Sequence, residues 1–170
     1  MNIFYTDPNP HIAANQHCNI HQVKMILEYS QLLSTAHHVL GSDEETLANV
    51  YKKTHENHPS AVWVRQSKRH YAWLFNCLMQ LHKLFCDRTG KDHASVAIVP
   101  YLRNKPRRMS EDGFTPPTLA MPEKFKQRDH ALAYQSYLNG KFDEWESRDN
   151  PLKCVWTTRK PEWRKKHESN

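Results

Sequence analysis

The sequence predicts an all-α, compact, single-domain helical bundle, and three observations support that fold class. Only 4 of the 170 residues are glycine, which is too few for the many turns of an all-β fold. Residues 11–40 contain no proline or glycine, so a helical stretch can continue until Gly41. Between residues 59 and 88, apolar side chains recur at steps of three and four residues, as on one face of a helix. A chain of this length can bury one hydrophobic core without disulfides or metals.

Local signals divide the chain into expected helices. Asn19 is placed to cap a second helix after a short first one, and Ser42 begins a stretch that resembles a capping box. Pro59 suits the first turn of a long helix, and Asn139-Gly140 suits the end of the last one. We therefore expect helices over residues 11–40, 43–52, 59–88, 93–103 and 129–138.

Three segments lack a helical pattern. Residues 2–6 form a short β-prone run, so we expect an extended N-terminal segment. Residues 104–128 contain several prolines and should be irregular. The basic, aromatic stretch after Pro151 should be irregular as well. We therefore divide the chain into a helical catalytic-type domain, residues 1–150, and a basic aromatic C-terminal tail, residues 151–170.

The formal net charge of +6 favours a polyanionic partner, and its distribution favours nucleic acid. One basic cluster spans residues 103–108, and another, interleaved with tryptophans, spans residues 156–166. Cations beside flat aromatic rings suit phosphate contact combined with base stacking, and a merely solvated tail has the same composition. We expect nucleic-acid contacts from Arg65, Arg69, Arg103, Lys105, Arg107, Arg108, Trp156, Arg159 and Trp163.

The cysteines and the N-terminal residues bear on the cellular compartment. The four cysteines include no C-x-x-C pair, and the first residues lack the basic and apolar regions of a secretory signal. We expect reduced thiols, with Cys77 and Cys86 packing as small hydrophobic side chains. No apolar run is long enough for a membrane span, and no Gly-rich nucleotide motif occurs. We expect a cytoplasmic monomer that uses no cofactor.

The expected helix over residues 20–39 carries one polar stripe on an otherwise apolar surface. His21, Lys24 and Glu28 fall within an arc of roughly 100°, together with Gln31 and Thr35. The stripe faces either open solvent or a cleft. In a cleft, a carboxylate, an amine and an imidazole can transfer protons or form a Schiff base.

A metal site is the competing interpretation of the histidines. His17 and His21 are spaced i, i+4, and His55 and His58 form a second pair. Four imidazoles can hold zinc. The sequence lacks an H-E-x-x-H motif, a close cysteine pair and an acidic cluster at ligand spacing, so the main prediction includes no metal. If no metal binds, His55 and His58 are expected to have a structural role, capping and packing in the loop before the long helix.

Short motifs in the chain resemble the pyrimidine-dimer DNA glycosylase family, the phage endonuclease V-like group that has phage and bacterial members. All of them fall within residues 1–145. The motifs are Met1-Asn2-x-Phe4, His21-x-x-Lys24-x-x-x-Glu28, Asn57-His58-Pro59 before a Trp-bearing helix, and Pro116-Pro117.

The resemblance implies a compact all-α enzyme that acts on double-stranded DNA with an extruded, damaged or modified base. In this family, the α-amine of the N-terminal residue attacks the sugar carbon, a glutamate on the first long helix assists proton transfer, and the Schiff base permits strand cleavage. Glu28 matches that glutamate. Residue 2 is Asn, which usually leaves the initiator methionine in place. The nucleophile would then be the Met1 amine, with Lys24 as the alternative. Leu27 departs from the family, which has a basic DNA contact there.

We therefore expect a DNA base-processing enzyme, an N-glycosylase with or without abasic-site lyase activity. Glu28 would act as the acid/base group, and His21 and Lys24 would orient it. Two other functions stay open: a non-catalytic nucleic-acid-binding protein, and a metal-dependent enzyme that uses the four histidines.

Overall fold

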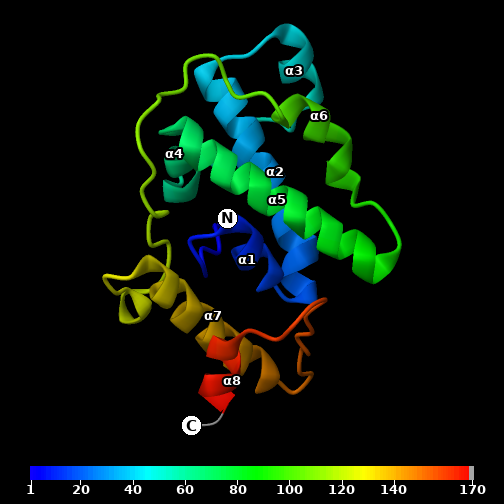
Figure 1. Cartoon of the computed structure of the whole chain (residues 1–170), viewed down its shortest axis with the longest axis vertical. Coiled ribbons are helices and arrows are strands. Elements are labelled where there is room, and N and C mark those ends of the chain that lie inside the picture. The colour runs from blue at the N-terminus through cyan, green and yellow to red at the C-terminus, as the bar shows by residue number, and fades with distance from the viewer. Residues whose placement is uncertain (169–170) are drawn as a thin grey trace.

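The computed structural model of the chain describes the backbone of residues 1–168 and the side chains of residues 1–165. Within that part all regular structure is helical, which confirms the predicted all-α class (Figure 1). None of these helices combines the length and the apolar character that crossing a bilayer requires. The elements are α1 (Pro10–Asn15), α2 (Asn19–Leu40), α3 (Glu44–Asn49), α4 (Pro59–Arg65), α5 (Lys68–Thr89), the 3-10 helix η1 (Ala94–Ile98), α6 (Val99–Leu102), the 3-10 helix η2 (Glu123–Phe125), α7 (His130–Glu146) and α8 (Glu162–Glu168).

Helices α2 and α5 form the centre of the fold, and α1 and α4 pack against them. Figure 1 shows α5 crossing α2 obliquely. Fully buried side chains line both helices, among them Tyr29, Leu33, Leu74 and Leu81. Burying a large apolar side chain contributes about 1.5–3 kcal/mol, so this crossing stabilises the fold strongly. The apolar face predicted within residues 59–88 is the face of α5 that enters the core.

The N-terminal segment, residues 2–6, lies inside the fold, and its apolar side chains are buried. No strand forms there. The Phe4 amide donates to the Tyr29 hydroxyl of α2 at 3.0 Å, and the Gln135 side chain of α7 donates to the Thr6 carbonyl at 2.9 Å. The segment therefore links α2 to α7.

The single long helix predicted over residues 59–88 is two helices, α4 and α5, separated at Ser67. The backbone of Ser67 is extended, and its hydroxyl accepts a hydrogen bond from the Arg69 amide. The same hydroxyl donates to the Asp112 carbonyl at 2.8 Å. The prediction is wrong here because a side-chain cap and a distant carbonyl replace the helical hydrogen bonds lost at the break.

Helix α7 continues through Asn139-Gly140, where the sequence predicted its end. A Cβ atom added at Gly140 would lie 2.8 Å from Cζ of Phe125 in η2. The glycine therefore makes room for η2 instead of ending the helix. Asn139 is buried, and Arg164 of α8 donates to its side chain at 3.4 Å. Tertiary contacts override the local stop signal.

Two predicted helix caps are displaced by one residue. Cys18 is the N-cap of α2, whereas Asn19 is the first helical residue. Asn19 instead pairs with Val155, through both its backbone amide and its side-chain oxygen. Asp43, and not Ser42, caps α3 by accepting from an amide of its first turn.

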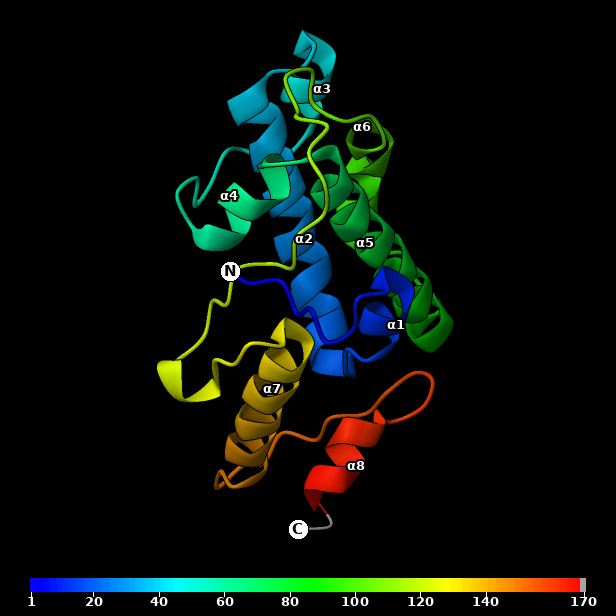
Figure 2. The same ribbon diagram turned by 60° about the vertical axis from the view of Figure 1, so that its left-hand side comes forward.

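The C-terminal segment belongs to the folded body and is not a free tail. Residues 151–161 are irregular, as predicted, but α8 follows them and lies close to α7 (Figure 2). Arg164 is buried, with 1% of its side chain exposed, and forms ion pairs with Asp143 at 2.7 Å and Glu146 at 2.9 Å. Residues 169–170 of the predicted tail lie outside the described part.

The two tryptophans of this segment are packing residues. The indole N–H of Trp156 donates to the Gln16 carbonyl at 2.9 Å, and that of Trp163 donates to the Gln16 side chain at 3.2 Å. Trp163 also stacks on Phe142 of α7, with ring centroids 6.4 Å apart. Internal contacts therefore hold both indoles, which are partly exposed, and base stacking by Trp156 and Trp163 stays a prediction.

The four cysteines are free thiols. Cys77 is fully buried in the core, as predicted. Cys86 is only partly buried, and its thiol contacts His82 and Asp92. The prediction that Cys86 packs as a small hydrophobic side chain is wrong, because the end of α5 places polar partners around it.

Two buried histidines make the fold sensitive to acid. Burial lowers the pKa of His37 to about 4, and burial with the nearby His21 lowers the pKa of His17 to about 3. His37 contacts the Tyr71 hydroxyl at 2.7 Å and the Ser42 hydroxyl at 2.6 Å. Since an unfolded histidine takes up its proton near pH 6.5, the unfolded state binds more protons than the folded state below that pH.

We predict that the free energy of unfolding falls as the pH is lowered from 6.5 to 4, with about 3 kcal/mol of the loss arising from His37. Urea denaturation across this range measures it. A His37→Gln variant should be less stable at pH 7 but should lose less stability on acidification. His11→Gln, at an exposed position, should keep the wild-type slope. An unchanged slope in His37→Gln would contradict the assignment.

We predict that Arg164→Ala lowers the free energy of unfolding by about 1–3 kcal/mol, because it removes buried packing and leaves two carboxylates without this partner. The matched control is Arg148→Ala, which removes an exposed ion pair with Glu144, a residue of α7 like the two partners of Arg164. That change should lower the free energy of unfolding much less, because solvent screens an exposed ion pair. Equal losses in the two variants would show that α8 does not depend on Arg164.

Candidate active site at the N-terminal amine

The N-terminal amine lies against the middle of α2. The Met1 nitrogen is 3.7 Å from Oε2 of Glu28. The two side chains are largely shielded, with 4% of the Met1 side chain and 14% of the Glu28 side chain exposed, while Met1 as a whole is partly exposed. Figures 1 and 2 both show the N-terminus beside α2, between α4 and α7. The fold therefore brings together an amine and a carboxylate from distant parts of the sequence.

Asn2 holds the residue next to this amine. Its side-chain amide donates to the Ala120 carbonyl at 2.9 Å. Its side-chain oxygen accepts from the Ile3 amide at 2.8 Å and from the Tyr134 hydroxyl of α7 at 3.2 Å. These bonds, with the buried side chains that follow, restrict where the Met1 amine can lie. Sequence reasoning missed Tyr134, because no local signal links it to residue 2.

Lys24 contributes a second amine to the same carboxylate. Its Nζ is 3.7 Å from Oε1 of Glu28, at the i, i+4 spacing that the sequence predicted. Lys24 differs from Met1 in exposure, since 59% of its side chain is open to solvent. Leu27, also exposed, borders Glu28 on the helix. Lys24 and Leu27 are therefore two solvent-exposed neighbours of the carboxylate on α2.

His58 is the third titratable group near the amine. Burial lowers its pKa, and the positive charge of the N-terminus and of His55 lowers it further, while Glu28 opposes the shift. Its Nδ1 accepts from the Ser60 amide at 3.1 Å and caps α4. The neutral ring therefore carries its proton on Nε2. The sequence predicted His58 to be either a metal ligand or a cap, and the structure shows it as the cap of α4. No feature of the sequence predicts that His58 interacts electrostatically with the Met1 amine.

The predicted polar stripe on α2 does not form one open face. His21 is buried, with Phe4 at 4.6 Å and Trp145 at 5.2 Å between ring centroids. Thr35 is also buried and donates to the Thr54 carbonyl. The prediction that His21 orients Glu28 is not supported, because aromatic side chains from the N-terminal segment and α7 enclose its ring.

The four-histidine metal site does not form. Nδ1 of His17 contacts the Ala13 carbonyl at 2.7 Å, and Nε2 contacts the Tyr29 hydroxyl at 2.8 Å, so both ring nitrogens are occupied. His55 is exposed and contacts its neighbour Thr54. Among the described residues, one group of three metal-ligating side chains converges, and it lies elsewhere, at the end of α5 and in the loop that follows.

The predicted phosphate-binding cations differ in their exposure and in their protein contacts. Arg69, Arg103, Lys105 and Arg107 are exposed. Arg108 donates to the Leu40 carbonyl at the end of α2. Two others also have protein partners, Arg65 with the Glu56 carbonyl and Arg159 with Glu162. The cations between residues 103 and 107 are exposed, and their contact with phosphates stays a prediction.

The described surface also has two hollows away from the amine. One, of about 360 Å³, lies between α1 and residues 158–162. The other, of about 310 Å³, lies beside Ser67 and His70. Neither is lined by Met1 or Glu28, so the candidate site is a partly open surface and not one of these hollows.

An amine that has lost its proton is a nucleophile toward carbonyl and sugar carbons, and a carboxylate beside it can accept and return protons. The Met1–Glu28 pair supplies both groups without a cofactor. Comparisons with family models, curated proteins and solved structures found no match to this chain.

We predict that Asn2→Ala loosens the N-terminal segment. The loss of three hydrogen bonds at a buried position should lower the free energy of unfolding by about 1–3 kcal/mol. The substitution should also speed reductive methylation of the Met1 amine, and mass spectrometry measures that rate. Asn49→Ala, at an exposed position on α3, should change neither quantity. An unaltered methylation rate in Asn2→Ala would show that Asn2 does not position the amine.

Proposed function

We propose that this protein is a DNA base-processing enzyme, an N-glycosylase with abasic-site lyase activity that works through the Met1 amine. One observation carries the proposal: the amine lies 3.7 Å from the shielded Glu28 carboxylate, on a segment that the core holds in place. The short motifs shared with pyrimidine-dimer DNA glycosylases support it, since that family pairs an N-terminal amine with a glutamate.

In the proposed reaction, the Met1 amine gives up a proton to Glu28 and its nitrogen forms a bond to C1′ of the deoxyribose. The bond between C1′ and the base breaks, and the base leaves with the electron pair and takes up a proton. Opening of the sugar ring then gives a Schiff base between Met1 and C1′. Removal of a C2′ proton expels the 3′ phosphate, and water releases the product. Glu28 carries protons between these steps.

Met1 is a better nucleophile than Lys24 in this setting. Met1 packs against the core, whereas Lys24 extends into solvent. A fixed nucleophile loses less conformational entropy on reaction. Lys24 is better suited to attract a phosphate.

The basic surface supports DNA as the substrate. The protein carries a net charge of +6, and the backbone amide of Arg107, an exposed cation, donates to the carbonyl of Gly41 at the C-terminal end of α2, the helix that carries Glu28. Contacts between such cations and phosphates favour DNA binding through counterion release. A damaged or modified base extruded from the duplex would expose C1′ to the amine.

We predict that borohydride traps a covalent adduct between the protein and a duplex with an abasic site. Glu28→Gln should slow adduct formation at least about 100-fold, because the acid/base group is lost. Its DNA affinity should stay at the wild-type level in a gel-shift titration. Glu45→Gln on the exposed face of α3 is the control and should trap normally.

Peptide mapping of the adduct locates the nucleophile, after intact mass has shown that Met1 carries a free amine. Lys24→Ala should still form the adduct. An adduct on Lys24 would move the nucleophile to that residue. Undiminished trapping by Glu28→Gln would remove Glu28 from the mechanism. DNA binding without an adduct would favour a non-catalytic nucleic-acid-binding protein.

A further inference from the structure

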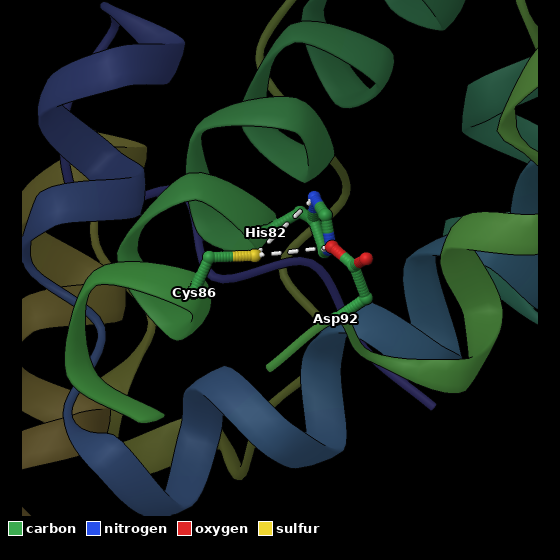
Figure 3. A group of neighbouring side chains, drawn as sticks. All are labelled: His82, Cys86 and Asp92. Atoms are coloured by element: carbon green, nitrogen blue, oxygen red, sulfur yellow. Dashed lines mark hydrogen bonds and ion pairs between the residues drawn. The ribbon is translucent and has the colours of Figure 1, made fainter. Parts of the chain in front are cut away.

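A second cluster of reactive side chains lies at the end of α5, on residues that the proposed reaction does not use. It consists of His82 and Cys86 from the last turns of the helix and Asp92 from the loop after it. Figure 3 shows the three side chains pointing toward one another. Close cysteine pairs and histidine pairs, the usual metal-binding patterns in a sequence, do not include this mixed set. His82 and Cys86 nevertheless have the i, i+4 spacing of two ligands on one helix face.

The backbone is shaped to bring Asp92 back to the helix. Gly90 ends α5 in a left-handed conformation, with φ at 68°, and its amide bonds to the Cys86 carbonyl. A side chain at that φ would be strained, so the turn favours glycine. On the far side, His93 contacts the Val23 carbonyl of α2 at 3.2 Å and caps η1. Asp92 is therefore held between two anchored positions.

The three ligand atoms have the separations of a tetrahedral zinc site. Nε2 of His82 lies 3.4 Å from Sγ of Cys86 and 3.3 Å from Oδ1 of Asp92. Sγ of Cys86 lies 3.5 Å from the same carboxylate oxygen. Usual zinc bond lengths and tetrahedral angles give separations of about 3.3–3.6 Å between such atoms. The sulfur also lies 4.0 Å from Nδ1 of His82, so the imidazole ring must turn to direct the Nε2 lone pair at an ion that all three atoms share.

The local charge also favours a cation. The Cys86 thiol donates to Oδ1 of Asp92, so a carboxylate already faces the sulfur. A divalent ion between them would stabilise the thiolate. Because 75% of the Asp92 side chain is exposed, the cluster opens to solvent on that side.

We propose that His82, Cys86 and Asp92 bind a zinc-class divalent ion, with a fourth position that faces solvent and holds water. One nitrogen, one sulfur and one oxygen ligand suit zinc, and sulfur disfavours magnesium and calcium. The ion would join the end of α5 to the loop that leads to η1. This site is independent of the Met1–Glu28 reaction.

The test is titration of the full chain with cobalt(II), which replaces zinc and has visible absorption. We expect one cobalt per chain, a thiolate-to-cobalt charge-transfer band, and loss of both signals when zinc is added. Cys86→Ser should abolish the charge-transfer band. His82→Ala and Asp92→Asn should each weaken cobalt binding at least about 10-fold.

Asp92→Asn is the decisive variant, because an exposed side chain can be changed without disturbing the core; circular dichroism checks the fold. Asp87→Asn removes a nearby carboxylate that pairs with Lys83 instead of the cluster, and Cys154→Ser removes a thiol elsewhere. Both controls should bind cobalt as the wild type does. The absence of a thiolate band, unchanged binding by Asp92→Asn, or equal weakening by Asp87→Asn would overturn the proposal.

Discussion

The burial of residues 2–6 is the constraint on which the candidate site depends. A chain terminus is usually at the surface, because its charged amine is costly to remove from water. Here four consecutive side chains, from Ile3 to Thr6, are buried, and hydrogen bonds from α2 and α7 satisfy part of the backbone. The Met1 amine therefore lies next to this buried segment, and the negative charge of Glu28, 3.7 Å away, stabilises it there.

The same burial explains why α7 and the C-terminal segment are part of one body. Phe4 packs against His21, and His21 packs against Phe142 and Trp145 of α7. Phe142 in turn contacts the tryptophans of the C-terminal segment. This chain of rings runs from the N-terminus to α8. A division of the molecule at residue 150 would cut through it.

The two candidate sites use the chain in different ways. At the amine, the groups come from the N-terminus and from α2, so their meeting depends on the whole core. At the end of α5, two ligands share one helix and the third follows a short glycine turn, so the cluster is nearly local. The first site should therefore respond to changes anywhere in the core, whereas the second should respond mainly to its own turn.

The sequence by itself determined the helical class and those features that depend on neighbouring residues. The i, i+4 pairing of Lys24 with Glu28 follows from helix geometry, and Gly41 marks the end of α2 as predicted. Only the tertiary structure decided the break at Ser67 and the passage of α7 through Gly140, because Asp112 and Phe125 make the deciding contacts.

The candidate site shows the same division. Sequence periodicity placed Glu28 and His21 on one helix face, but it could not show that aromatic rings enclose His21 or that Met1 reaches Glu28. No fixed sequence spacing predicts that Asp92 contacts the thiol of Cys86. Periodicity reports which residues share a face of one helix. What meets that face depends on segments far away in the chain, and so only the packed core decides it.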